Sequence, residues 1–153
     1  KLKEQEKEKR IEQKQLAKER IPVIAKSLLE CKQGTITIDN ITMELAGSGK
    51  ANFCYSTSDN YDDVFHIGLG EALCKADPKL VYCGLFEQGE KIRAIVYAGE
   101  DISKEKSAGE IVKRISQILG GAGGGSPKFA QGGGIDKSKK EDAIKNAKSM
   151  IIE

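Results

Sequence analysis

The sequence predicts an α/β fold of the α+β-like kind: a long N-terminal helical, coiled-coil-like segment, then a small globular domain with a β-sheet packed by helices. Three observations lead to this prediction. Residues 1–20 hold no glycine or proline and are rich in Glu, Lys, Gln and Leu, which favour helices. Residues 33–99 change to the alternation of apolar and polar side chains that is typical of strands. Two amphipathic helical patterns then flank a glycine-rich tract at residues 120–134.

The N-terminal segment is expected to form a helix whose first turns are exposed to solvent on all sides and whose later turns are more apolar. An apolar stripe with roughly seven-residue spacing predicts that residues 1–32 are a dimerisation segment. A lone helix solvated on all sides is an open alternative, because fewer than about four clean heptads are present. Pro22 should kink the helix or start a second one. The stripe consists of Leu2, Ile11, Leu16, Ile21, Val23, Ile24 and Leu28, and all of these except Ile21 are the candidate dimerisation residues.

The middle of the chain predicts a small sheet. Apolar side chains alternate with polar ones at residues 36–38, 41–45 and 53–55, which indicates three short strands. Residues 80–86 and 92–98 are apolar runs on either side of a glycine-containing turn. Continuous apolar runs of this length are typical of strands that are buried on both faces, so we expect a hairpin here.

Three helices should pack on this sheet. Asp59 or Asn60 is expected to cap the first, and Pro78 follows its end. The pattern Ser-Ala-Gly-Glu at residues 107–110 is a capping box that begins the second helix, and the glycine tract ends it. A second capping box, Ser-Lys-Lys-Glu at residues 138–141, begins the last helix. Residues 33–153 are therefore predicted to form one globular domain.

Composition excludes several classes of function. The chain has 153 residues, which suits about one domain, and 25 basic against 23 acidic side chains leave a net charge of only +2. A uniformly basic nucleic-acid coat is thus excluded, and an aromatic share of 5% disfavours a stacking-rich RNA-binding sheet. We find no signal-peptide pattern and no apolar run of the roughly 18 residues that a membrane helix needs. We expect a cytoplasmic piece of a longer protein with no membrane contact.

The cysteines and the single histidine form no catalytic or metal-binding pattern. No cysteine pair has C-x-x-C spacing, so we expect no metal site and four buried, reduced thiols. His66 lacks an assignable nucleophile and should be structural or exposed. The residues at 47–50 fail the full P-loop pattern, so nucleotide binding there is disfavoured. The cysteines are Cys31, Cys54, Cys74 and Cys83.

The glycine-rich tract is the best candidate for a binding site. Eight of the 17 glycines lie within residues 120–134. Pro127, Phe129 and Gln131 interrupt the tract, which a flexible linker would not need. Three lysines crowd the start of the next helix, where cations oppose the helix dipole, so an anion such as phosphate is indicated. A plain loop with solvated lysines is the open alternative. The lysines are Lys137, Lys139 and Lys140.

The segment from Ser107 through the tract Gly-Gly-Ala-Gly-Gly-Gly-Ser-Pro-Lys-Phe-Ala-Gln-Gly-Gly-Gly to Gly134 resembles the C-terminal domain of alanyl-tRNA synthetases, the DHH-associated (C-Ala) module. The resemblance covers about residues 33–153, and the N-terminal helix is similar to the part through which these domains dimerise. It departs from the family pattern at residues 126–129, where the family often has Arg-Pro-Asp-Met. Some phosphoesterases carry the same module, so the substrate-binding lobe of such an enzyme, acting on nucleic acid or nucleotides, is the alternative.

The resemblance implies a non-catalytic part of a class II alanine–tRNA ligase. Such a domain dimerises the enzyme and binds the elbow, or outer corner, of alanine tRNA, which supports aminoacylation and editing by other domains. It implies a homodimer, contacts with the catalytic and editing domains, and no cofactor in this part, since ATP, Mg and Zn serve other domains of the family. Phe129 is expected either to stack on RNA or to pack the tract on the core. The candidate tRNA-binding residues are Lys128, Phe129, Gln131, Lys137, Lys139, Lys140, Lys113, Arg114, Gly123, Gly124 and Gly125.

Overall fold

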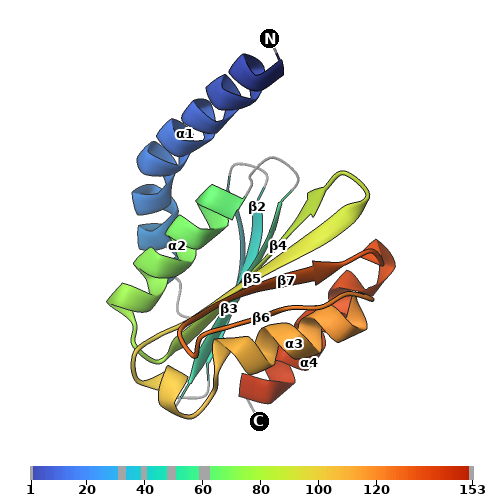
Figure 1. Cartoon of the computed structure of the whole chain (residues 1–153). Coiled ribbons are helices and arrows are strands. Elements are labelled where there is room, and N and C mark those ends of the chain that lie inside the picture. Colours follow the sequence, from blue (N-terminus) through green and yellow to red (C-terminus); the bar gives the residue numbers. More distant parts are fainter. Residues whose placement is uncertain (1, 31–33, 39–40, 48–50, 59–62, 152–153) are drawn as a thin grey trace.

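A seven-stranded sheet lies between two layers of helix in the computed structural model, which describes residues 2–30, 34–38, 41–47, 51–58 and 63–151 (Figure 1). The strands are β1 (Gly34–Ile38), β2 (Ile41–Gly47), β3 (Asn52–Ser58), β4 (Leu80–Gln88), β5 (Lys91–Ala98), β6 (Gly124–Gly125) and β7 (Phe129–Gly134). Their order in the sheet is β1-β2-β3-β4-β5-β7-β6. Neighbouring strands are antiparallel except for the parallel pair β3–β4.

The helices cover both faces of this sheet (Figure 1). They are α1 (Leu2–Glu30), α2 (Asp63–Ala76), η1 (Ile102–Lys104), α3 (Ala108–Ile118), η2 (Lys137–Lys139) and α4 (Lys140–Ile151). Because a parallel pair needs a crossover connection, α2 joins β3 to β4 across one face. Helices α3 and α4 pack together on the opposite face, and α1 packs against α2. The expected sheet packed by helices is confirmed.

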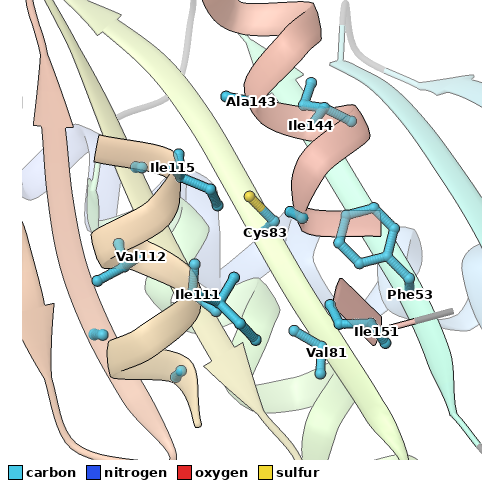
Figure 2. Packing of buried hydrophobic residues seen from close by; sticks show 14 of the residues in the cluster. Phe53, Val81, Cys83, Ile111, Val112, Ile115, Ala143, Ile144 and Ile151 are labelled. Carbon is cyan, nitrogen blue, oxygen red and sulfur yellow. The ribbon is translucent and has the colours of Figure 1, made fainter. Parts of the chain in front are cut away.

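The main core lies between the sheet and the α3–α4 pair (Figure 2). Every second side chain of β4 and β5 points into this layer, because side chains alternate between the faces of a strand. Each buried aliphatic side chain contributes about 1.5–3 kcal/mol of stability relative to an exposed one. The side chains that meet there include Phe53, Val81, Cys83, Ile111, Val112, Ile115, Ala143, Ile144 and Ile151.

A buried polar cluster lies on the opposite face, beneath α2. The His66 Nδ1 atom lies 2.7 Å from the Tyr82 hydroxyl and 3.2 Å from the Ser56 hydroxyl, and the two hydroxyls also hydrogen-bond each other. The Phe86 ring stacks on the imidazole, with 5.1 Å between ring centroids. A Cβ atom at Gly84 would lie 2.6 Å from His66 Nδ1, so only glycine fits there. Burial lowers the pKa of His66 to about 3, so the histidine is neutral and structural.

Helix α1 touches the domain near its C-terminal part and extends beyond the sheet (Figure 1). A Cβ atom at Gly68 in α2 would lie 2.6 Å from Ile21 Cδ1, which shows how closely the helices approach. The helix continues through Pro22, so the second helix start expected there is not observed. Ile11 is 60% exposed and Val23 is 48% exposed. The remaining stripe side chains lie outside what the structure describes: Leu2, Leu16, Ile24 and Leu28.

The predicted strands and helices are observed, but the capping of α3 differs from expectation. Ser107 occupies the N-cap position without a side-chain hydrogen bond. Instead, the amides of Ala108 and Gly109 donate to the carbonyl oxygens of Pro127 and Ser126 at 2.9 and 3.2 Å. The turn of the glycine-rich tract lies against the helix end and supplies these acceptors, so the capping box is not formed.

The described cysteines are buried free thiols, as expected. Burial raises the pKa of Cys74 and Cys83 to about 12 and also raises that of Cys54, so these thiols are unreactive. Cys31, the expected caps Asp59 and Asn60, and residues 48–50 lie outside the described residues, as does the expected boundary at 32/33. Within the described ranges no group of acidic, Cys or His side chains is arranged to hold a metal ion, and no helix meets the length and hydropathy needed to cross a bilayer.

Candidate nucleic-acid interface

Much of the glycine-rich tract forms a hairpin at the edge of the sheet, where a loop over residues 120–134 was expected. Strand β7 pairs with β5 from Phe129 to Gly134, and β6 pairs with β7 on its other side. Pairing of this kind uses only backbone groups, so the glycine residues of β6 and β7 can hydrogen-bond in the sheet as other residues do. The Ala98 amide donates to the Lys128 carbonyl at 2.8 Å, and the Ser126 amide to the Phe129 carbonyl at 2.9 Å, which fixes the turn.

Close packing explains most of the glycines in the tract. A Cβ atom at any of six positions would come closer than 3.0 Å to neighbouring atoms: Gly121, Gly123, Gly125, Gly132, Gly133 and Gly134. Gly133 also has φ of +153°, and its amide donates to the Ser116 hydroxyl at 3.1 Å. A Cβ atom at Gly124, in contrast, would meet no atom within 4 Å. Among the glycines of β6 and β7, only Gly124 therefore has no neighbour that excludes a side chain.

Lys128 and Phe129 lie at the start of β7. Lys128 is exposed in the turn before the strand. The Phe129 ring is half-buried against Tyr97, its partner across the sheet, with 5.2 Å between ring centroids. This contact is of the packing kind, one of the two roles expected for Phe129.

The lysines that begin the last helical segment lie beyond the other end of β7. Here the N-terminus of η2 already has an anion of its own, because the Asp136 carboxylate accepts from the Ser138 amide at 3.1 Å. Asp136 therefore caps this segment in place of the expected Ser138. The Lys137 ammonium donates to the Gly89 carbonyl at 2.7 Å and lies 3.8 Å from the Glu87 carboxylate. The Asp136 carboxylate thus already supplies the negative charge that the helix dipole favours at this end, so the dipole alone does not require a bound phosphate.

The other candidate cations are spread over separate elements. Lys139 lies 3.9 Å from the Asp142 carboxylate. Lys113 and Arg114 are exposed on α3, on the side turned away from its buried apolar residues. Lys128 precedes β7 and Lys137 follows it, and six strand residues span roughly 20 Å. The candidate residues therefore line an extended surface and do not form one compact patch.

A groove of about 420 Å³ lies between the start of β5, the end of β7 and residues 120–122. Lys91 and Arg93 line it, together with Gln131 and the glycine backbone of both segments. The Arg93 guanidinium donates to the Gln131 side-chain oxygen at 3.3 Å. Sequence reasoning missed Lys91 and Arg93. The available signal was that two cations alternate with apolar residues at the start of a strand that is otherwise apolar.

Comparisons with known proteins agree with this architecture. The DHHA1 domain family matches residues 50–153. The chain is 44% identical over 150 residues to an alanine–tRNA ligase of Nitrosopumilus maritimus, covering 98% of this chain and 16% of that protein. It is 41% identical over 92 residues to the alanine–tRNA ligase of Cenarchaeum symbiosum, covering 60% of this chain and 10% of that protein. The chain therefore spans only a small part of these relatives.

A solved structure shows the same fold. The C-Ala domain of Aquifex aeolicus alanyl-tRNA synthetase superposes with a TM-score of 0.65 at 25% identity, covering 70% of this chain and 96% of that one. The family match extends over more than half of the chain and contains strands β3 to β7, with the glycine-rich hairpin, and helices α2, α3 and α4. This chain therefore belongs to the DHHA1 domain family, in the form found as the C-terminal C-Ala domain of alanyl-tRNA synthetases.

Proposed function

We propose that this domain dimerises an alanine–tRNA ligase and binds the elbow of alanine tRNA, which supports aminoacylation and editing by the other domains. The observation that carries the proposal is the β6–β7 hairpin of a C-Ala-like domain, exposed at the sheet edge. RNA affinity comes largely from contacts with phosphates, and selectivity comes from shape. A rigid, side-chain-poor edge with cations at both ends suits a folded RNA surface better than a stretched single strand.

The cations divide into two groups. Lys128, Lys113 and Arg114 are exposed and make no ion pair with the described residues. Lys137 and Lys139 are held near carboxylates, so a phosphate must compete with those acidic groups. Exposed ion pairs are worth about 0–1 kcal/mol, which a phosphate contact can replace. All the candidate lysines can therefore contact phosphates of the tRNA. The cations without a neighbouring carboxylate, Lys128, Lys113 and Arg114, should contribute most to the binding affinity.

The dimerisation role is proposed for α1. Ile11 and Val23 are exposed apolar side chains on a helix whose described side chains from position 4 to position 19 are all exposed. A second copy of α1 would cover such residues. We propose no cofactor for this domain, and we propose the catalytic and editing domains as its further partners in a cytoplasmic enzyme.

Binding of the chain to whole alanine tRNA and to a tRNA with a disrupted elbow tests the RNA role. Intact tRNA should bind at least tenfold more tightly at the same salt concentration. Changing Lys137, Lys139 and Lys140 together to Gln should weaken binding and flatten its salt dependence. The matched control replaces three exposed lysines elsewhere: Lys18, Lys75 and Lys79. Equal binding of both tRNAs would contradict elbow recognition, and equal binding of short single strands would favour the phosphoesterase alternative.

Analytical ultracentrifugation tests the dimer. The double variant Ile11→Gln and Val23→Gln should shift the mass toward the 16.6 kDa of one chain. Deletion of residues 1–28 should shift the mass toward that of a single shortened chain. The control variant Lys7→Gln with Lys14→Gln changes two exposed polar positions of the same helix. A dimer that survives the deletion would place the interface on the globular part.

A further inference from the structure

We infer that the groove at the start of β5 holds a phosphodiester group of RNA and that Arg93 is the side chain that positions it. The inference rests on the proposed RNA-binding function and deepens it. The sequence motif predicted binding residues in the hairpin and among the lysines that follow it. The cations of this groove, Lys91 and Arg93, lie instead on the neighbouring strand β5.

The charge of the groove favours an anion. Lys91 and Arg93 both line it, and none of its described lining residues is acidic. Neither cation makes an ion pair with an acidic side chain in the described part of the chain, in contrast to Lys137 and Lys139. A phosphate entering the groove would therefore meet two cations without displacing a carboxylate.

Arg93 is oriented for such a contact. It lies on the β5 face opposite the core, directly across from Gly133 and diagonal to Gln131 on β7. Because Gly133 has no side chain, the long Arg93 side chain reaches over β7 to the Gln131 oxygen, 3.3 Å away. One guanidinium donor is used in that bond, and the planar fork has further donors in the geometry that a phosphate accepts.

The rest of the groove suits a nucleotide backbone. Gly121, Gly132 and Gly134 contribute only backbone to its lining, so a ribose-phosphate chain can approach closely. Ile135 is 70% exposed at the rim and offers an apolar surface to a ribose or a base. Lys137 lies at the same end of the sheet, since its ammonium reaches the Gly89 carbonyl in the β4–β5 turn. The groove therefore lies beside one of the lysines already proposed to contact tRNA.

Filter-binding titrations over several salt concentrations test the site. The double variant Lys91→Gln with Arg93→Gln should bind alanine tRNA at least about tenfold more weakly, with a salt slope lower by about one, as expected for one lost phosphate contact. The single variant Arg93→Lys should keep the salt slope of the wild-type chain, because the positive charge is kept. It should bind tRNA more weakly than wild type, because the planar fork of the guanidinium is lost. The matched control is Lys75→Gln with Lys79→Gln, two exposed lysines around the α2–β4 turn. Lys91→Gln alone keeps the test valid if replacing Arg93 unfolds the domain.

Two results would overturn the groove assignment while leaving the proposed function intact. One is that wild-type chain binds tRNA and the double variant binds it with the affinity and slope of the control. The other comes from amide NMR spectra, if AMP shifts the resonances of Gly121 and Gly132 whereas tRNA leaves them unchanged, since the groove would then hold a free nucleotide. Failure of the wild-type chain to bind tRNA would refute the proposed function itself and this inference with it.

Discussion

Replacing His66 by glutamine should change how the stability of the domain depends on pH. The imidazole is fully buried among Ser56, Tyr82 and Phe86, and burial lowers its pKa from 6.5 to about 3. In the unfolded chain the histidine binds a proton near its usual pKa, so between pH 6.5 and 3 the unfolded state holds more protons than the folded state. Stability therefore falls as the pH drops through this window.

The magnitude follows from the two pKa values. One pKa unit corresponds to about 1.4 kcal/mol, so the folded state should lose about 2 kcal/mol by pH 5 and about 4 kcal/mol by pH 3.5 through this residue. The variant His66→Gln should cost about 1–3 kcal/mol at pH 7, because part of the buried hydrogen-bond network is lost. The variant lacks the titrating imidazole, so its stability does not fall through this residue as the pH drops. The two proteins should therefore have equal free energies of unfolding near pH 5, and the variant should be the more stable one below that pH.

Urea unfolding followed by circular dichroism at pH 7, 6, 5 and 4 measures this difference. Subtracting the two curves removes the contribution of the carboxylates, which both proteins share. The chain has a single histidine, so its NMR signal reports the folded pKa without ambiguity, and it should not titrate between pH 8 and 4. Parallel stability curves for the two proteins, or an NMR midpoint near 6.5, would refute the role assigned to burial.

Two further predictions concern the glycine-rich hairpin and the thiols. Gly133→Ala should destabilise the domain by about 3 kcal/mol, because φ is +153° and a Cβ atom would strike the Ile92 carbonyl, whereas Gly124→Ala should leave stability unchanged or raise it by up to about 1 kcal/mol. Thermal melts of the pair check this, and equal melting temperatures would show that the packing at Gly133 is misjudged. In a Cys31→Ser background the remaining thiols should resist a disulfide reagent at pH 8 until the chain is unfolded in urea, since burial raises their pKa values. Rapid labelling of the native protein would contradict their burial.

Local patterns were sufficient for most of the fold. The alternation around Phe53 and the apolar runs before and after Gly89 predicted strands that the structure contains. The period of Ile111, Val112 and Ile115 predicted the buried face of α3. Such patterns are readable because burial of one face imposes the period of the element on its own sequence.

The candidate site was predicted only in part. The sequence pointed to the glycine-rich tract, and the structure places Gln131 of that tract beside the groove. It did not reveal Arg93, because this residue meets Gln131 only when β5 and β7 pair, 38 residues apart in the chain. The sequence also did not reveal that the Asp136 carboxylate accepts from the Ser138 amide at the start of η2. Phosphate contacts by the lysines there stay a prediction.

By itself, then, the sequence determined the order and type of the α-helices and of strands β1 to β5, the family resemblance and the location of the glycine-rich tract. Only the tertiary structure decided that this tract is an edge hairpin, that its carbonyls cap α3, and that Lys91 and Arg93 share a groove with it. The physical reason is that glycine has no side chain to carry a pattern. Its structure is set by the strand and helix against which its backbone packs, and those partners are known only once the chain is folded.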